Sequence, residues 1–182
     1  MELETERLRI RSIEAGDWSA LAEYVTREDV MRYDRPWPTS EAALQEAVAT
    51  LAAMGGFWGI CERDTGRLIG HVMCRRSGDP ELATWDIGIG LHPIFQRRGH
   101  ATEACRCVLA YVFGAQRARR VVASCDPRNE LAWRLLERLG FRREAHHREA
   151  CFLRRSQDGS PIWVDAYEYA LLAPEWRERA AG

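Results

Sequence analysis

One stretch near the middle of the chain joins a strand to a helix through a short loop. Residues 84–91 (TWDIGIGL) alternate apolar side chains with small or polar ones, which predicts a half-buried strand. After Gly99, apolar residues recur at helical spacing, which predicts an amphipathic helix that begins at His100. A strand that leads directly into a helix indicates an α/β fold, in which helices cover the faces of a sheet.

The remaining segments complete one such sheet. Apolar periodicity and turn residues predict further strands over residues 8–11, 57–61, 68–74, 121–125, 141–155 and 162–172. They predict further helices over residues 18–25, 40–53 and 129–139. Tight turns at Asp64–Gly66 and Asp158–Gly159 are expected to close two hairpins. We therefore expect a single α/β domain over residues 1–182, with a mixed, mostly antiparallel central sheet flanked by helices.

The charge of the chain limits its partners. The formal net charge of the 182 residues is −1, which argues against general binding to nucleic acid or to a membrane surface. All 26 basic residues are arginine. A lysine Schiff base and the phosphate-binding lysine of a P-loop are therefore excluded.

The cysteines and the apolar runs indicate a reducing, aqueous compartment. None of the six cysteines forms a CxxC motif, and the acidic start of the chain lacks the basic and apolar regions of a secretory signal. The longest uncharged run, residues 47–61, is shorter than the roughly 18 residues of a membrane helix. His146 and His147 have no third ligand at metal spacing. We expect a cytoplasmic protein without a membrane segment or a metal site.

The loop before the helix at His100 has the features of an anion site. Residues 96–101 (QRRGHA) place a glycine where the free N–H groups and the dipole of a helix start converge. Gly99 has no Cβ to block a phosphate, and Arg97 and Arg98 add positive charge. A pyrophosphate fits such a loop, whereas the glycine spacing of a Walker loop or of a dinucleotide fingerprint is absent. A plain strand-to-helix turn that uses a convenient glycine is the alternative.

A second segment accompanies this loop. Residues 129–141 read N-x-x-A…L-G-F, and together with residues 96–101 they resemble the GNAT acetyltransferase superfamily. Residues 5–11 (TERLRIR) and Trp163–Asp165 are similar to one branch, the ribosomal-protein alanine N-acetyltransferases. The resemblance implies an enzyme that transfers an acetyl group from acetyl-CoA to a primary amine, either on a protein N-terminus or on a small molecule.

The resemblance also implies where acetyl-CoA binds. In the family, this loop contacts the pyrophosphate largely through backbone N–H groups. The corresponding residues here are Arg97, Arg98, Gly99, His100, Ala101 and Thr102. The pantetheine arm is expected to pair, like an added strand, with Ile89, Gly90 and Leu91. A backbone N–H near Leu91 would polarise the thioester carbonyl. Asn129 would hydrogen-bond the pantetheine or the thioester end, and it also suits the cap of the helix that follows. Arg128 is a candidate contact for the 3′-phosphate.

The reaction that the resemblance implies requires a base, because only a neutral amine attacks the thioester. Asp86 is the candidate, since family members often carry an acidic residue at this point of the strand. It shares a strand face with Gly88 and Gly90, which are expected to leave room for a substrate, and it can act through a water. A structural or substrate-ordering carboxylate is the alternative. Glu81 and His71 are weaker candidates for the base.

Two positions depart from the family pattern. Leu136 stands where many members carry a tyrosine that protonates the leaving thiolate, and Trp133 replaces a serine common in the alanine acetyltransferase branch. No general acid is therefore visible, and water is expected to suffice for the thiolate of CoA. A catalytically weak acyl-CoA-binding module is the alternative function. A third hypothesis is a nucleotide-binding protein, but the absence of lysine argues against it.

The acceptor site is expected between the first two helices. Tyr33, Trp37 and Pro38 lie in that segment, and Trp58 and Trp85 are expected to line the same groove. An N-terminal peptide requires an open groove, whereas a small amine favours a closed, acidic pocket. The sequence leaves the acceptor and the oligomeric state open.

Overall fold

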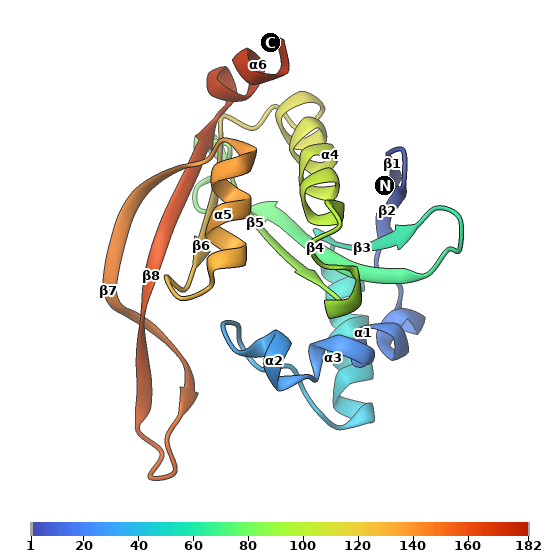
Figure 1. Cartoon of the computed structure of the whole chain (residues 1–182), viewed down its shortest axis with the longest axis vertical. Coiled ribbons are helices and arrows are strands. Elements are labelled where there is room, and N and C mark those ends of the chain that lie inside the picture. Colours follow the sequence, from blue (N-terminus) through green and yellow to red (C-terminus); the bar gives the residue numbers. More distant parts are fainter. Residues whose placement is uncertain (1, 182) are drawn as a thin grey trace.

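Strands form one sheet that runs through the molecule (Figure 1). The computed structural model describes residues 2–181, and side chains through residue 179. The strands are β1 (Glu2–Glu4), β2 (Leu8–Ser12), β3 (Phe57–Glu62), β4 (Leu68–Arg76), β5 (Thr84–Leu91), β6 (Arg120–Cys125), β7 (Arg142–Arg155) and β8 (Pro161–Leu172). They follow the order β1-β2-β3-β4-β5-β6-β8-β7. Only β5 and β6 pair in parallel among these strands, which confirms the predicted mixed, mostly antiparallel sheet.

Helices flank the sheet on both faces. Within the described residues they are α1 (Trp18–Val25), α2 (Glu28–Met31), α3 (Glu41–Met54), α4 (His100–Gly114), α5 (Glu130–Leu139) and α6 (Ala173–Ala181). Every strand and helix predicted from the sequence is present, with small differences at the ends. β1, α2 and α6 were not predicted. β1 and α2 are too short to show a hydrophobic period, and α6 carries Trp176 as its single large apolar side chain.

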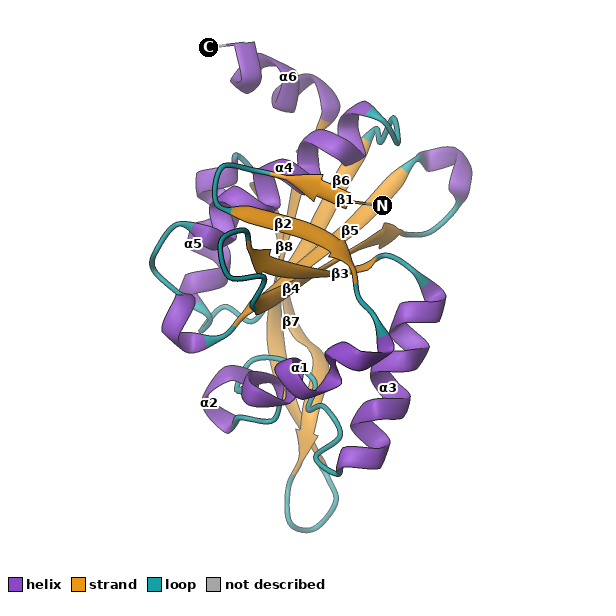
Figure 2. Ribbon diagram, turned by 90° about the vertical axis from the view of Figure 1, so that its right-hand side faces the viewer, coloured by secondary structure: helices purple, strands orange, loops and turns teal. Residues whose placement is uncertain are grey.

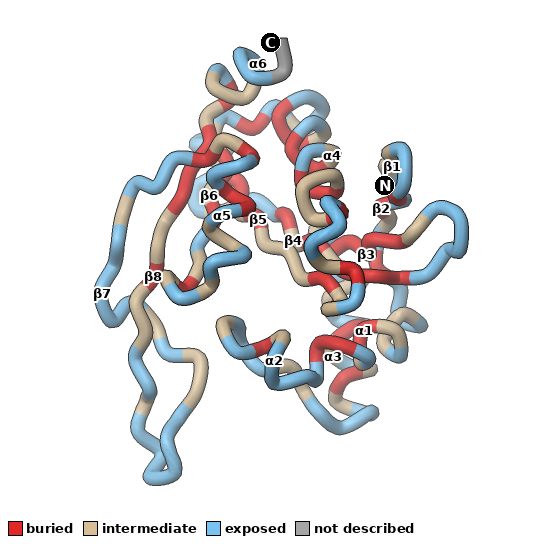
Figure 3. Tube along the Cα trace, viewed as in Figure 1, coloured by how far each residue is buried: buried red, intermediate tan, exposed pale blue. Residues whose placement is uncertain are grey.

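Helices lie on both faces of the sheet (Figure 2), and each face has a separate core. On one face, Leu109 of α4 and Leu135 of α5 belong to a cluster of buried side chains from β2 to β8. On the other face, Leu21 of α1 and Val48 of α3 pack with residues of β3 and β4. Figure 3 shows the buried residues along the sheet and on the inner sides of the helices. Any residue at the centre of the sheet therefore faces one of two different sets of helices.

β5 presents different side chains to these two cores. Trp85 and Ile87 belong to the core under α4 and α5. Asp86, Gly88 and Gly90 alternate with them and face the side of α1 and α3, because successive residues of a strand point to opposite faces. The structure thus confirms the predicted division of this strand into an apolar face and a face with an acid and two glycines.

A gap opens between β5 and β6. Thr84–Asp86 pair with Arg120–Val122, whereas β5 continues to Leu91 and β6 continues to Cys125 without further pairing. The two strands diverge below α4 and α5 in Figure 1. The C-terminal part of β5 therefore has an edge that no neighbouring strand satisfies within the described chain.

The direction of the backbone groups on this edge follows from the bonds to β4. The carbonyl of Thr84 accepts a hydrogen bond on the β4 side, and the N–H of His92 donates one on the same side, each at 2.9 Å. Backbone groups alternate between the two neighbours of a strand. The N–H and C=O groups of Ile89 and Leu91 therefore point into the gap, whereas those of Gly90 point to β4.

Candidate active site

The loop at the start of α4 has the backbone conformation of an anion site. Arg97 (φ +58°) and Gly99 (φ +85°) both lie in the left-handed region, and such alternation turns successive N–H groups toward one point. The first bond of the helix runs from the N–H of Glu103 to the carbonyl of Gly99 at 3.0 Å. The N–H groups from residue 100 to residue 102 therefore have no acceptor within the helix. The dipole of α4 adds positive charge at the same place.

A network from the N-terminal segment holds this loop. Arg7 donates to the carbonyl of Arg98 at 3.0 Å and forms an ion pair with Glu103 at 2.5 Å. The hydroxyl of Thr5 donates to Glu103 at 2.6 Å. Burial raises the pKa of Glu103, but the hydrogen bonds from Thr5 and Arg7 outweigh it and the pKa is lowered. This support could not be predicted from the sequence, because Arg7 and Glu103 are far apart in the chain.

The side chains of the predicted pyrophosphate residues have different roles. The ring of His100 is buried, and its Nδ1 lies 3.3 Å from the carbonyl of Phe95. The hydroxyl of Thr102 accepts a hydrogen bond from Arg138 of α5 at 3.3 Å. Arg97 and Arg98 are exposed, and the guanidinium of Arg98 lies 5.7 Å from the centre of the Phe95 ring. His100, Ala101 and Thr102 thus offer backbone groups to a ligand, whereas the two arginines can offer side chains.

The gap between β5 and β6 offers backbone groups from Ile89 and Leu91. The carbonyl of Leu91 accepts a hydrogen bond from the side chain of Gln96 at 3.1 Å, which ties the end of the strand to the anion loop. The Leu91 N–H remains directed into the gap. Gly90 lies between these residues, but its own backbone groups face β4.

Asn129 stands at the other side of the gap, where α5 begins. Its Oδ1 accepts a hydrogen bond from the N–H of Ala132 at 3.2 Å, so it caps the helix. The cap uses the carbonyl oxygen and leaves the Nδ2 group of Asn129 available as a donor. The buried carboxylate of Asp126 fixes the turn that leads into this cap. It accepts hydrogen bonds from the backbone N–H of Arg128 at 2.8 Å and from the guanidinium of Arg128 at 2.6 Å. The role of Asp126 was not predicted, although the turn sequence Asp-Pro-Arg-Asn is typical of such side-chain contacts.

Asp86 lies at the closed end of the gap. It is half-buried and pairs in register with Val122 of β6 on one side and Arg75 of β4 on the other. Burial raises the pKa of Asp86, and the positive charge of Arg75 opposes the shift only in part. A carboxyl whose pKa is raised toward the working pH is suited to accept a proton. Glu81, the weaker candidate, lies in the exposed turn Pro80–Leu82 before β5.

His71 fills space that was expected to be free for a substrate. Its Nδ1 lies 2.7 Å from the hydroxyl of Tyr24, and its ring stacks on Phe57 with 4.8 Å between centres. A Cβ atom on Gly90 would lie 2.5 Å from Cε1 of His71, so the imidazole covers Gly90. The expectation that both glycines leave room is therefore wrong for Gly90. At Gly88 the nearest atom to an added Cβ is Cε of Met73, at 3.5 Å.

Burial also sets the charge of His71. It lowers the pKa of this imidazole to about 4, so the ring is neutral at physiological pH. The hydrogen bond to Tyr24 and the aromatic neighbours identify His71 as part of the packing between α1 and the sheet.

Two of the tryptophans expected at the acceptor site lie elsewhere. Trp58 and Trp85 belong to the core under α4 and α5 and line a cavity of about 240 Å³ on that face. Trp37 packs on the opposite face, 5.8 Å from His71. The expectation that all three line one groove is wrong, because β3 and β5 turn Trp58 and Trp85 away from α1 and α3.

Leu136, which stands where many family members carry the tyrosine that acts as general acid, is part of the core. Leu136 is 8% exposed and packs with the side chains under α4 and α5. Trp133 is half-buried, and the guanidinium of Arg134 lies 5.2 Å from its ring centre. Neither side chain can donate a proton to a leaving group.

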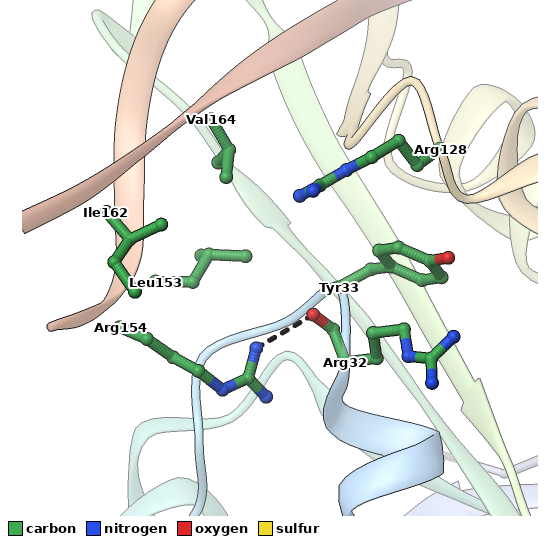
Figure 4. A pocket seen from close by; sticks show the side chains of 7 residues that line it. All are labelled: Arg32, Tyr33, Arg128, Leu153, Arg154, Ile162 and Val164. Carbon is green, nitrogen blue, oxygen red and sulfur yellow. Dashed lines mark hydrogen bonds between the residues drawn. The ribbon is translucent and has the colours of Figure 1, made fainter. Parts of the chain in front are cut away.

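A pocket of about 360 Å³ lies between the segment after α2 and the β7–β8 hairpin (Figure 4). It is lined by Arg32, Tyr33, Arg128, Leu153, Arg154, Ile162 and Val164. The guanidinium of Arg128 lies 5.9 Å from the centre of the Tyr33 ring. Arg128, which lines the pocket, directly precedes Asn129, the N-cap of α5.

Metal-binding clusters are absent from the part of the chain that the structure describes: no group of three or more His, Cys, Asp or Glu side chains there could hold a metal ion. His146 and His147 are instead hydrogen-bonded to Asp165 and Glu168, each at 2.7 Å. No helix in residues 2–181 combines the length and the apolar character that crossing a membrane requires.

The sequence and the fold of this chain are similar to those of known acetyltransferases. The family model "Acetyltransferase (GNAT) domain" matches residues 7–142. The chain is 31% identical over 180 residues to the uncharacterized N-acetyltransferase YnaD of Bacillus subtilis, covering 97% of this chain and 99% of that protein. It is 23% identical to the [ribosomal protein uS5]-alanine N-acetyltransferase of Escherichia coli, covering 97% and 93%. The crystal structure of a GNAT-family acetyltransferase from Bacillus anthracis superposes with a TM-score of 0.84 at 28% identity, covering 96% and 99%. The chain therefore belongs to the GNAT family of acetyl-CoA-dependent acetyltransferases.

Proposed function

We propose that residues 1–182 form a single N-acetyltransferase domain that moves the acetyl group of acetyl-CoA to a primary amine by direct attack on the thioester. One observation carries the proposal: the gap beyond Asp86 and the anion loop at Gly99 lie at the two ends of the same free strand edge. From residue 86 to residue 91 this edge is about 17 Å long. An extended ligand that ends in a pyrophosphate fits this arrangement.

The chain offers separate contacts to the two parts of acetyl-CoA. The N–H groups of Gly99, His100, Ala101 and Thr102 would hold the pyrophosphate, with added charge from Arg97 and Arg98. Ile89 and Leu91 would hydrogen-bond the pantetheine arm as a neighbouring strand would. The Nδ2 group of Asn129 would donate from the side of β6.

The reaction would take place at the closed end of the gap. Asp86 would accept a proton from the ammonium form of the acceptor, directly or through a water, because burial raises its pKa. The neutral amine would attack the thioester carbon, and a free backbone N–H on this edge of β5 would stabilise the negative charge on the carbonyl oxygen. The C–N bond forms and the C–S bond breaks, and the proton that the nitrogen loses on becoming an amide passes through water to the leaving thiolate, because Leu136 is in the core and offers no acid.

The names of the relatives support an amine as the acceptor. The Escherichia coli relative is named for acetylating an alanine of ribosomal protein uS5. At 23% identity this supports the reaction type and leaves both a protein N-terminus and a small amine as acceptors for this chain.

Release of free thiol from acetyl-CoA, measured with a panel of amines and amino-terminal peptides, tests the proposal. Amine-dependent release, with the acetylated amine identified by mass spectrometry, is expected. If acetyl-CoA binds but no amine or peptide increases thiol release, the chain is an acyl-CoA-binding module and the transferase proposal fails.

A further inference from the structure

The peptide bond between Arg98 and Gly99 determines where one N–H group of the anion loop points. Its carbonyl oxygen accepts a hydrogen bond from Nη1 of Arg7 at 3.0 Å. A trans peptide holds its C=O and N–H groups in opposite directions, and no peptide bond in the described chain is cis. The N–H of Gly99 therefore points away from Arg7. It has no hydrogen-bond acceptor among the described residues, so a ligand can accept from it.

The loop does not fix this orientation by itself. Gly99 has a φ of +85°, but glycine adopts negative φ about as readily. A flip of the peptide unit would therefore meet little steric resistance from Gly99. It would turn the carbonyl of Arg98 to the side where the N–H now points, and a bound anion would meet a partial negative charge instead of a donor. A group outside the loop is needed to hold the peptide.

Arg7 is itself held by both its backbone and its side chain. Its N–H donates to Glu103 at 3.0 Å, and its carbonyl accepts from the N–H of Arg63 at 2.9 Å. Its Nε donates to the same carboxylate at 2.7 Å. The guanidinium also lies against the loop, since an added Cβ on Gly99 would lie 3.2 Å from Nη2. Arg7 is therefore ordered before a ligand arrives, and its bond to the loop costs little further entropy.

Resting on the proposed function, we propose that Arg7 is a positioning residue for acetyl-CoA. Its hydrogen bond to the carbonyl of Arg98 keeps the N–H of Gly99 directed at the pyrophosphate. Arg7 acts through the backbone, because it contacts the opposite side of the peptide from the ligand. This distinguishes it from Arg97 and Arg98, whose exposed side chains can contact a phosphate directly.

Two thioesters test this role. Acetyl-CoA and S-acetyl-pantetheine share the acetyl group and the pantetheine arm, but only acetyl-CoA carries the pyrophosphate. Arg7→Met keeps an unbranched side chain and removes every side-chain donor. Calorimetric titration is expected to show that Arg7→Met binds acetyl-CoA roughly tenfold more weakly than the wild type, because a charge-assisted hydrogen bond is lost. The affinity for S-acetyl-pantetheine is expected to stay unchanged.

Further variants separate this role from a structural one. Glu103→Gln removes the ion pair with Arg7 and leaves the bond from Arg7 to the carbonyl of Arg98, so it should keep its acetyl-CoA affinity within about twofold. Arg9→Met removes an arginine that pairs with Glu2 instead of the loop, and it should bind acetyl-CoA normally. If Arg7→Met does not fold, Arg7→Lys takes its place. Its single ammonium replaces the fork of the guanidinium, so acetyl-CoA should bind more weakly and S-acetyl-pantetheine equally well.

The outcomes separate this inference from the proposed function. The role of Arg7 is overturned, and the transferase stands, if Arg7→Met binds acetyl-CoA as tightly as the wild type. The same conclusion follows if Glu103→Gln loses as much affinity as Arg7→Met, or if Arg7→Met loses affinity for both thioesters equally. If the wild type binds neither thioester, the proposed function fails, and the role of Arg7 fails with it.

Discussion

Asp86 and Val122 form the last paired position between the parallel strands β5 and β6. Beyond this pair the strands separate, and the backbone groups of Ile89 and the N–H of Leu91 point into the gap. A half-buried carboxyl thus lies where a ligand held along the free edge would end. The proposed reaction requires that Asp86, the candidate base, lies where the gap between β5 and β6 closes.

Replacement of Asp86 by asparagine should lower turnover and leave acetyl-CoA binding nearly unchanged. A general base contributes about 10²- to 10⁴-fold to a rate, and the amide cannot accept the proton. Steady-state kinetics and calorimetric binding of acetyl-CoA measure the two effects. Glu81→Gln, in the turn that precedes the same strand, is the control and should retain full turnover. Equal turnover of Asp86→Asn and the wild type would remove Asp86 as the base.

The pH profile gives a second test of Asp86. The base is active when deprotonated, and burial raises its pKa. Activity should therefore fall on acidification at a higher pH than for an ordinary aspartate. In Arg75→Gln the opposing positive charge is gone, so the acidic limb should move to still higher pH. If the fall in activity on acidification occurs at the same pH in Arg75→Gln as in the wild type, a group other than Asp86 controls it.

Gly99 and Gly159 allow backbone strain to be separated from ligand binding. Their φ angles are +85° and +86°, so a side chain at either position costs about 1–2 kcal/mol. Gly99→Glu also places a carboxylate at the anion site and should abolish acetyl-CoA binding. An added Cβ at Gly99 also lies 3.2 Å from the guanidinium of Arg7, whereas one at Gly159 meets open space, so Gly159→Glu should lose less stability and bind acetyl-CoA normally. Denaturant unfolding and calorimetry measure both quantities, and tight binding by Gly99→Glu would refute the pyrophosphate assignment.

Gly90 is predicted to be required for packing. An added Cβ would lie 2.5 Å from His71, whose ring is fixed by Tyr24 and Phe57. Gly90→Ala should lower the free energy of unfolding by about 1–3 kcal/mol. Gly88→Ala, on the same strand face, should change it little because the nearest atom is 3.5 Å away. Urea unfolding checks this, and equal effects at the two positions would contradict the packing described for His71.

The pKa of His71 predicts a loss of stability in acid. The imidazole titrates near 6.5 when the chain is unfolded and at about 4 when it is buried. Between these values the unfolded state binds a proton that the folded state does not, so the free energy of unfolding falls as the pH drops from 6.5 to 4. The loss is at most about 3 kcal/mol. His71→Gln should reduce this slope relative to His147→Gln, which alters an exposed imidazole. Identical slopes in urea titrations from pH 4 to pH 7 would count against a buried neutral His71.

Local patterns were sufficient to predict most of the elements. The alternation in residues 84–91 and the apolar spacing after Gly99 depend on neighbours within one turn or one strand, so the sequence shows them directly. The same holds for the cap formed by Asn129. β1 and α2 were missed because a few residues carry no measurable period.

Features that arise between distant segments could not be predicted in this way. Arg154 bonds to Met31 across 123 positions, and this contact closes the pocket that the sequence did not reveal. The wrong expectation for Trp58 and Trp85 has the same origin, because the face that each side chain occupies depends on strand pairing. The conformation of Arg97 was also hidden, since left-handed backbone is rare outside glycine.

Thermal unfolding with and without acetyl-CoA tests the central claim most directly, namely that the gap and the loop at Gly99 hold this ligand. At about a hundred times the dissociation constant, binding stabilises a protein by about 2.7 kcal/mol. For a chain of this size, Tm should rise by roughly 5 to 10 °C. The account predicts this rise with acetyl-CoA, no rise with ATP or NAD, and no rise with acetyl-CoA in Gly99→Glu. An unchanged Tm of the wild type at saturating acetyl-CoA, or an equal rise in Gly99→Glu, would contradict it.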